Sequence, residues 1–255
     1  MRVQFVSDLH LNSWGNIPFE KLLEPSAKIL VLAGDIGHPD STLLRSFMKW
    51  CSIRWETIFW IPGHHEMMDV WHFKNRSYDD CLAHMRLCVA EYPNIIILHR
   101  DAFVTEDGFI FLGCSLWARL TSMSEELFND PLTKNITKHF EEDLRWLKEQ
   151  IRRAEVPVVI ATHYPPTYTL LNKSFINKPT SVPFALETEV LMRPPVVAWI
   201  CGYLHESVQI QRPYMDAEGG SGGVLIVSNA LGYPDDPSHF YRKDAVLRLE
   251  KPKTK

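Results

Sequence analysis

The stretch Phe5-Val6-Ser7-Asp8-Leu9-His10 joins an apolar run to two polar side chains and gives the first indication of the fold. Its apolar part predicts a β-strand that ends just before Asp8. Asp8 and His10 are two residues apart, so on an extended chain they project to the same side. A carboxylate and an imidazole placed together where a strand gives way to a loop can be two ligands for a divalent metal ion. Taken alone, such a pair is more often an ordinary surface pair, so its meaning depends on the ends of the other strands.

Four further apolar runs also end in polar residues. They cover residues 28–33, 57–61, 156–162 and 195–200, and each is short enough for a strand that is buried on both faces. In α/β sheets, ligand sites form outside the carboxyl ends of the strands. We therefore expect the polar residues that follow these five strands to gather at one site. They are Asp8, His10, Asp35, His64, His65, His163 and His205.

Helical patterns alternate with these strands, which indicates an α/β fold. Residues 41–50 and 79–92 carry apolar side chains at helical spacing, and Ser41 is the expected N-cap of the first helix. The clearest helix covers residues 136–154, whose apolar stripe predicts packing against the core. His139 lies off this stripe, so we expect it to be in solvent.

The remaining segments are predicted to be turns or loops. Residues 103–113 have the pattern of a hairpin, and residues 122–134 are polar and irregular. Residues 167–187 are expected to form a long loop close to the site. The glycine-rich residues 216–223 lack the strand and helix that flank a dinucleotide fingerprint, and they lack the Gly-Lys-Ser/Thr of a phosphate loop. We therefore predict a hairpin tip there.

The composition fits a single globular domain that spans residues 1–255. Hydrophobic residues make up 45% of the chain, which is enough for a substantial core. The net charge of −4 argues against nucleic acid as the main partner, because that role usually needs a basic surface. The five cysteines form no Cys-x-x-Cys pair and predict reduced thiols in a cytoplasmic protein. No signal peptide is recognised, and no apolar run has the length of a membrane span, so we expect no membrane partner.

The order and context of five short motifs resemble those of the calcineurin-like metallophosphoesterases. The resemblance extends over nearly the whole chain, and the segments 31–36, 111–113 and 227–233 are similar to a bacterial-type branch of that family. It implies a single α/β domain in which two stacked mixed β-sheets form a sandwich flanked by helices. The five motifs are Asp8-Leu9-His10, Gly34-Asp35, Gly63-His64-His65-Glu66, Thr162-His163 and Gly202-Tyr203-Leu204-His205.

The resemblance also implies a centre of two metal ions, for which manganese, iron or zinc is expected. The implied ligands of the first ion are Asp8, His10 and His205, and those of the second are His163 and the residues at positions 64 and 203. Asp35 would bridge the two ions, and His65 would donate a proton to the leaving group. In such a centre, the ions deprotonate a water molecule that attacks phosphorus in line with the leaving group.

Two positions depart from the family pattern, and both fall on the second ion. His64 stands where the family usually has Asn, and an imidazole can replace an amide oxygen as a ligand. Tyr203 stands where the family usually has His, and a phenol ligates well only when a strongly acidic cation such as ferric iron deprotonates it. Three alternatives stay open: a second site rebuilt with His64 and Tyr203, a one-metal enzyme, and a metal-poor protein that serves as an interaction scaffold.

Retained hydrolysis is favoured over the scaffold role. The implied ligand set of the first ion is complete, and His65 is present. Ionisable groups at strand ends cost stability when they are buried, unless they are paired or bind a metal ion. We therefore expect a metal-dependent enzyme that hydrolyses a small phosphate mono- or diester.

Overall fold

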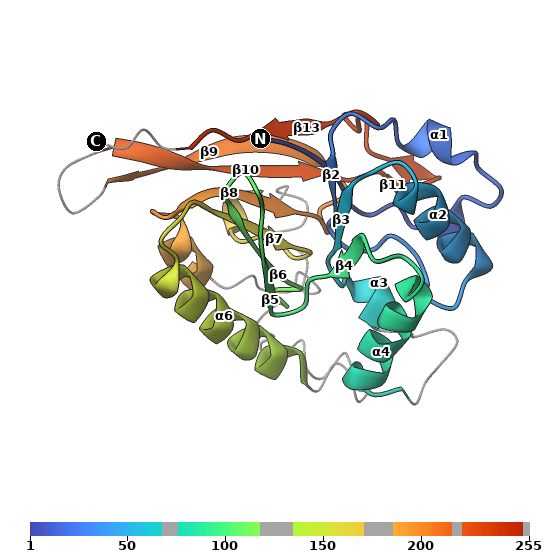
Figure 1. Ribbon diagram of the computed structural model, residues 1–255, viewed down its shortest axis with the longest axis horizontal. Helices are drawn as coiled ribbons and strands as arrows, with labels where there is room; N and C mark the ends of the chain where they lie inside the picture. The colour runs from blue at the N-terminus through green and yellow to red at the C-terminus, as the bar shows by residue number, and fades with distance from the viewer. Residues whose placement is uncertain (68–75, 118–134, 171–185, 216–220, 252–255) are drawn as a thin grey trace.

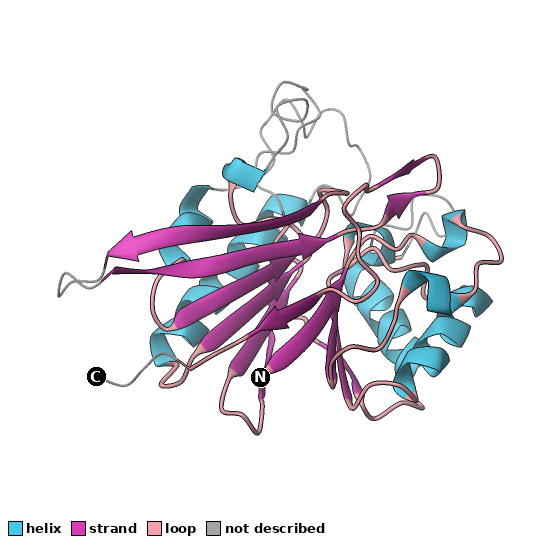
Figure 2. Ribbon diagram, turned by 90° about the horizontal axis from the view of Figure 1, so that it is seen from above, coloured by secondary structure: helices cyan, strands magenta, loops and turns pink. Residues whose placement is uncertain are grey.

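The computed structural model describes residues 1–67, 76–117, 135–170, 186–215 and 221–251. Two large β-sheets form the centre of the protein, and helices flank them, as Figures 1 and 2 show. Both sheets contain parallel and antiparallel pairs, so the expected sandwich of two mixed sheets is confirmed.

The first sheet has five strands in the order β13-β1-β2-β3-β4. The strands β1 to β4 run parallel to one another, and β13 pairs antiparallel with β1 at one edge. The bounds are β1 Arg2–Val6, β2 Ile29–Leu32, β3 Thr57–Trp60, β4 Ile95–Ile97 and β13 Val246–Arg248.

The second sheet has six strands in the order β5-β6-β7-β8-β10-β9. Its four inner strands are parallel, and the edge strands β5 and β9 are antiparallel to their neighbours. The bounds are β5 Asp101–Val104, β6 Ile110–Cys114, β7 Val158–Thr162, β8 Val196–Cys201, β9 Ser207–Met215 and β10 Ser221–Asn229. A small hairpin of β11 (Gly232–Tyr233) and β12 (Asp236–Pro237) follows β10.

The helices cover the outer faces of the two sheets. In Figure 1, α6 lies on the side of the second sheet, and α2 and α4 lie beside the first. The α-helices are α1 Phe19–Leu22, α2 Thr42–Ser52, α3 His64–Met67, α4 Tyr78–Val89 and α6 Ile136–Arg153. The short 3-10 helices are η1 Leu11–Ser13, η3 Tyr168–Leu170 and η4 Leu186–Leu191. None of the helices in the described ranges has both the length and the apolar composition that a membrane span needs.

Alternate residues of the strands face two different hydrophobic cores. Val31 and Phe59 point toward the second sheet, where the rings of Phe59 and Phe111 lie 4.8 Å apart. The intervening residues Leu30 and Leu32 pack with the helices instead. Strands that are buried on both faces need a nearly continuous apolar sequence, which is why these runs were recognisable as strands.

The predicted helices are confirmed with small shifts of their ends. The Ser41 side chain accepts a hydrogen bond from Leu44 N at 3.1 Å, as expected for an N-cap. The apolar stripe of α6 is buried, but the expectation for His139 is wrong. Its side chain is only 15% exposed, and its ring stacks on Tyr78 with the centroids 3.9 Å apart. Tyr78 is the first residue of α4. The spacing of apolar residues within α6 gives no information about this neighbour, so the contact could not be predicted from it.

The predicted hairpin is confirmed as the antiparallel pair of β5 and β6. The irregular segment 122–134, most of the loop 167–187 and residues 216–220 lie outside the described residues. Ser221 is the first residue of β10, so the glycines that follow it belong to a strand.

Candidate metal centre

Loops and the short helix α3 at one edge of the sandwich carry the predicted site residues. The loop after β1 carries Asp8 and His10, and the loop after β2 carries Asp35. The strands β1, β2 and β3 are parallel, as are β7 and β8, so the carboxyl ends within each group lie together. The candidates that follow β3, β7 and β8 are His64, His65, His163, Tyr203 and His205.

Five site residues have a left-handed backbone conformation, which is uncommon for residues other than glycine. Backbone hydrogen bonds hold the first loop in this shape: Asp8 N donates to Gly34 O at 2.9 Å, and His10 N donates to Asp35 O at 3.0 Å. Such strained residues persist only where the surrounding structure fixes them, and they concentrate at functional sites. The five residues are Asp8, His10, Asp35, Tyr203 and His205, with φ between 42° and 72°.

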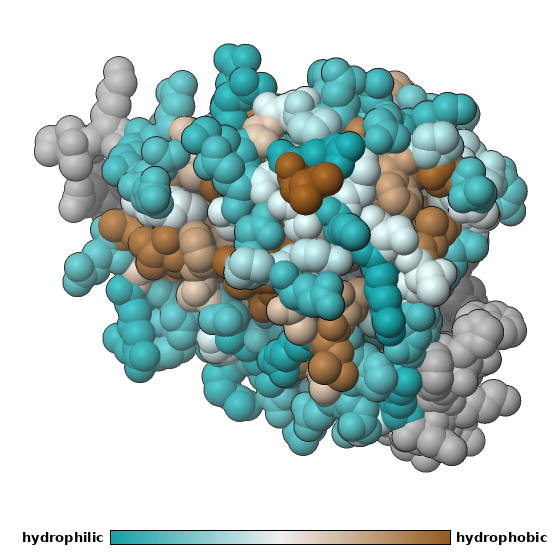
Figure 3. Space-filling model, turned by 45° about the vertical axis from the view of Figure 1, so that its right-hand side comes forward, coloured by the Kyte–Doolittle hydropathy of each residue, from teal (hydrophilic) through white to brown (hydrophobic). Residues whose placement is uncertain are grey.

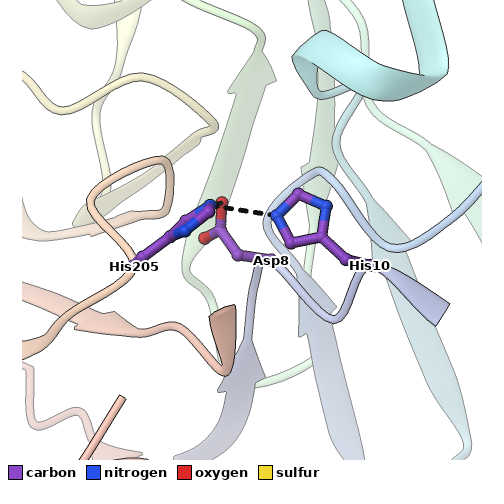
Figure 4. A group of neighbouring side chains, drawn as sticks. All are labelled: Asp8, His10 and His205. Atoms are coloured by element: carbon purple, nitrogen blue, oxygen red, sulfur yellow. Dashed lines mark hydrogen bonds and ion pairs between the residues drawn. The ribbon is translucent and has the colours of Figure 1, made fainter. Parts of the chain in front are cut away.

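Asp8, His10 and His205 form the first group of potential metal ligands (Figure 4). One ligand atom from each lies within 4.8 Å of the others. The Nε2 atoms of His10 and His205 are 2.9 Å apart, and His205 Nε2 lies 3.6 Å from Asp8 Oδ1. Burial, together with the nearby imidazoles of His65 and His205, lowers the pKa of His10 to about 3 against the opposing charge of Asp35. His10 is therefore neutral near pH 7, which is the state that binds metal ions.

Asp8, Asp35 and His163 form a second group, and all three side chains are buried. His163 Nδ1 donates to the backbone oxygen of Ala33 at 2.9 Å. This hydrogen bond directs Nε2 toward Asp35, whose Oδ2 lies 3.4 Å away. A backbone carbonyl that fixes one ring nitrogen in this way is typical of histidines that bind metal through the other.

The charge states of Asp35 and His163 depend on each other. Burial opposes ionisation of Asp35, but His163 and His65 hold the pKa of its carboxyl well below the usual range. Burial also opposes a charge on His163, but Asp35 and Asp8 raise its pKa to about 9. Without a metal ion, a proton on His163 therefore balances the carboxylates. A metal ion would take the place of that proton.

The donor atoms fit a bound metal ion. Among the described residues, the buried His163 Nε2 has no hydrogen-bond partner, although buried polar atoms are normally paired. Carboxylate oxygens and imidazole nitrogens together are the ligands that manganese, iron and zinc accept. A cation bound between Asp35 and His163 would give this nitrogen its partner.

His65 lies beside the same carboxylate but is more exposed. Its Nε2 atom is 3.8 Å from Asp35 Oδ2, and its side chain is 44% exposed. Its backbone N donates to Asp35 Oδ1 at 2.7 Å. Ligand atoms of His10, Asp35 and His65 also lie within 4.8 Å of one another. His65 is therefore positioned between the buried ligands and solvent.

His64 and Tyr203, the two positions that depart from the family pattern, both line the inner end of the cleft. Among the described residues, the close groups of ligand atoms include His65 but not His64, whose ring centroid is 5.4 Å from that of His65. The ring of Tyr203 stacks on that of Tyr164 at 4.4 Å and meets His163 edge-on at 5.7 Å. Burial, with the charges of Asp35 and Asp8, raises the pKa of Tyr203 to about 12. The phenol is therefore neutral near pH 7.

Glu66 is a supporting residue to which sequence reasoning gave no role. Its buried carboxylate accepts hydrogen bonds from Asp35 N at 2.9 Å, Ile36 N at 2.7 Å, Gly37 N at 3.3 Å and Gly63 N at 2.9 Å. These bonds hold the Asp35 loop against the start of α3. The available signal was an acidic residue directly after two histidines at the start of a helix.

Tyr233, in β11, is a second residue that was not assigned a role. Its hydroxyl lies 3.0 Å from His65 Nε2, and its ring stacks on that of His10. It ends the segment 227–233, which resembles a bacterial-type branch of the family, but the segment does not show the contact with His65, because that contact joins residues 168 positions apart.

An open cleft of about 880 Å³ gives access to the site. Its inner end is formed by Asp35, His64, His65, Tyr203 and His205. Its outer part is lined by residues that follow β8 and by the segment of the β11–β12 hairpin. The outer residues are Leu204, Glu206, Ser207, Val208, Tyr233, Asp236, Pro237, Ser238, His239 and Phe240.

Comparisons with known proteins agree with this arrangement. The family model described as calcineurin-like phosphoesterase matches residues 1–207. The chain is 24% identical to the uncharacterized protein L509 of Acanthamoeba polyphaga mimivirus, over 94% of each chain. One crystal structure superposes with a TM-score of 0.52 at 14% identity, over 90% of both chains. The crystal structure of TT1561 of Thermus thermophilus gives a TM-score of 0.50 at 12% identity, over 90% of this chain and 88% of the other.

The structural matches have low sequence identity and show the fold alone. The family model covers well over half of the chain and includes each loop that carries a candidate ligand. The chain therefore belongs to the calcineurin-like phosphoesterase family.

Proposed function

We propose that this protein is a metal-dependent phosphoesterase that hydrolyses a small phosphate mono- or diester. The observation that carries the proposal is the buried group of Asp8, Asp35 and His163, in which His163 Nε2 lies 3.4 Å from Asp35 Oδ2 and makes no hydrogen bond among the described residues. A buried ring nitrogen normally has a hydrogen-bond partner, whereas a nitrogen that binds a metal ion keeps its lone pair for the ion.

Each candidate ligand has an assigned place in this proposal. Asp35 would be shared between two ions, for which manganese, iron or zinc is suitable. Asp8, His10 and His205 would hold the first ion; His163 and His64 would hold the second, with Tyr203 as a further ligand or a substrate contact. When bound, the ions supply Lewis acidity that activates water and neutralises charge on the phosphoryl oxygens.

The protein's own groups perform the remaining steps. The left-handed loops that carry Asp8 and Asp35 hold these carboxylates in place before substrate arrives, so that little reorganisation is needed. His65 faces the cleft and donates a proton to the leaving-group oxygen, a role that histidine performs more often than any other side chain. Tyr203 and Tyr164 form an aromatic wall that excludes water from one side of the site.

The cleft favours a small substrate whose leaving group is not strongly anionic. Among the described lining residues are the carboxylates Glu206 and Asp236, and there is no lysine or arginine. Phe240 is 76% exposed and adds an apolar surface. A nucleic acid or a nucleoside triphosphate would require basic groups at this place. All five cysteines are buried free thiols, which supports the proposal that the protein works in the cytoplasm.

A metal-poor scaffold is the second candidate, and one observation favours it. The phenol of Tyr203 is neutral near pH 7 and occupies a position where a metal ligand is expected. However, the face in Figure 3 is mainly hydrophilic, and its hydrophobic side chains form small separate patches. Such a surface lacks the broad apolar area that permanent protein interfaces usually present.

Hydrolysis of p-nitrophenyl phosphate and bis(p-nitrophenyl) phosphate in the presence of Mn²⁺ tests the proposal. We expect turnover of at least one ester, its loss with chelator and its return with added metal. Asp35→Asn should lower kcat/KM at least about 1,000-fold, because it removes the shared ligand. Asp101→Asn, at an exposed position at the start of β5, is the matched control and should keep full activity. Turnover that persists in Asp35→Asn would contradict the proposal.

A further inference from the structure

Tyr233 contacts three histidines of the site. Its hydroxyl is 3.0 Å from His65 Nε2. Its ring stacks on that of His10, with centroids 4.1 Å apart and an interplanar angle of 16°. It meets the ring of His205 edge-on at 5.0 Å. One side chain therefore touches two candidate ligands of the first ion and the candidate proton donor.

The backbone fixes the place from which Tyr233 reaches the site. Leu231 N donates to Ser7 O at 3.2 Å, and Gly232 N donates to Asp8 O at 3.0 Å. Gly232 has a φ of +83°, and a Cβ atom added there would lie 2.9 Å from Asp236 O. The β11–β12 hairpin is thus attached to the loop that carries Asp8, and the position of the Tyr233 ring follows from that attachment.

The ring of His65 also meets that of His10 edge-on at 4.8 Å, but a ring contact alone does not hold Nε2 in one direction. Its side chain is 44% exposed, and the carboxylate oxygen of Asp35 lies 3.8 Å from Nε2, which is too far for a hydrogen bond. Among the described residues, Tyr233 is the one whose side chain forms a hydrogen bond with His65 Nε2. An exposed imidazole without this bond would rotate among several rotamers.

We propose that Tyr233 is a positioning residue for His65 and that its hydroxyl holds Nε2 at the wall of the cleft. This inference rests on the proposed hydrolysis. In the resting site, the phenol hydroxyl and His65 Nε2 share a hydrogen bond, in which the phenol oxygen accepts when Nε2 carries a proton. When the ester binds, its leaving-group oxygen replaces the phenol oxygen as the acceptor of that hydrogen bond and takes the proton as its bond to phosphorus breaks. Water supplies the new oxygen on phosphorus, and one of the protons released from that water or from solvent restores His65.

The substitution Tyr233→Phe isolates this role, because it keeps the ring that stacks on His10 and removes only the hydroxyl. A proton donor matters most when the leaving group is poor, so the effect should depend on the leaving group. On phenyl phosphate we expect kcat to fall about 10-fold with KM within about 2-fold. On p-nitrophenyl phosphate, whose leaving group is stable as an anion, kcat should fall less than about 3-fold.

Two further variants separate positioning from a general loss of structure. In a His65→Asn background, Tyr233→Phe should cause no additional loss, because the group that it orients is gone. Tyr241→Phe is the matched control. Its buried hydroxyl donates to Leu22 O in the same C-terminal part of the chain, so this variant should lose stability and keep the leaving-group dependence of the wild type.

Three results would overturn the inference. Tyr233→Phe could leave both esters unaffected, lower both equally, or add its full loss to that of His65→Asn; each would show that the hydroxyl does not act through His65. In all three cases wild-type turnover remains, so the proposed function stands and this inference alone falls. If the metal-loaded wild type hydrolyses no ester, the proposed function fails, and the role of Tyr233 in it fails too.

Discussion

The Nδ1 atom of His163 donates a hydrogen bond to the backbone oxygen of Ala33 at 2.9 Å, across 130 residues of sequence. This bond joins the loop after β7 in one sheet to the end of β2 in the other. It determines which ring nitrogen faces Asp35, and so it orients a candidate metal ligand through a contact that is purely structural. The candidate metal centre therefore lies where the two sheets meet, and its geometry depends on how they pack.

Removal of the Glu66 charge should loosen the Asp35 loop. In Glu66→Gln, an amide NH₂ replaces an oxygen that accepts backbone hydrogen bonds, so at least one buried N–H group loses its partner. We expect the free energy of unfolding to fall by about 2–3 kcal/mol in urea titrations. The control Glu56→Gln removes an exposed carboxylate paired with Lys28 and should change stability by less than about 1 kcal/mol. Equal effects of the two variants would show that the Glu66 carboxylate does not hold the loop.

A methyl group at Gly34 should displace His163. A Cβ atom there would lie 2.4 Å from His163 Nδ1 and 2.8 Å from the Cα atom of Gly63, and the φ of +85° is strained for alanine. Gly15→Ala is the matched control, because Gly15 has a φ of +62° with nothing within 4 Å of the added atom. We expect Gly15→Ala to cost about 1–2 kcal/mol in chemical unfolding, and Gly34→Ala to cost clearly more and to weaken metal binding. Similar costs for both would mean that the clash relaxes without moving His163.

Restoration of histidine at position 203 should strengthen the second metal position. Tyr203→His replaces a phenol, whose pKa is raised to about 12, by a ligand that is neutral near pH 7. We expect higher occupancy of the second ion by elemental analysis after loading with Mn²⁺. Tyr92→His, outside the described lining of the cleft, should bind metal like the wild type. Unchanged occupancy in Tyr203→His would place Tyr203 outside the metal centre.

The stability of the metal-free protein should fall below pH 6.5. Burial, followed by the charges of Arg100 and His139, lowers the pKa of His99 to about 3. Between pH 6.5 and 3 the unfolded chain therefore binds a proton at His99 that the folded chain does not, so the free energy of unfolding rises with pH in this window. In His99→Gln, unfolding near pH 5 should take up about one proton fewer, measured as a flatter pH dependence of stability. An unchanged slope would show that His99 becomes protonated without unfolding.

Most of the strands and helices could be predicted because their signals are local, whereas the sandwich of two sheets was implied by the family resemblance. The run at β2 is apolar throughout, since it packs on the other sheet through Val31 and on helices through Leu30. The buried face of α6 follows from its own helical period. The candidate ligands could be found because each directly follows a strand end, where ligand sites of α/β sheets form.

The supporting residues could not be predicted, because their contacts depend on tertiary packing. Glu66 reaches Asp35 and Ile36 across about 30 residues, and Tyr233 reaches His65 across 168. His139 was expected in solvent, but it packs on Tyr78 from another helix. A periodic pattern identifies the face that an element buries and gives no information about its neighbours.

The number of metal ions bound per chain tests the proposed centre most directly. The purified wild-type protein would be loaded with Mn²⁺, desalted and measured by elemental analysis beside Asp35→Asn. We expect about two ions per wild-type chain and a marked loss in the variant, because Asp35 is the proposed shared ligand of both ions. A wild-type chain that retains no metal, or an Asp35→Asn variant that retains as much as the wild type, would contradict the proposed metal centre.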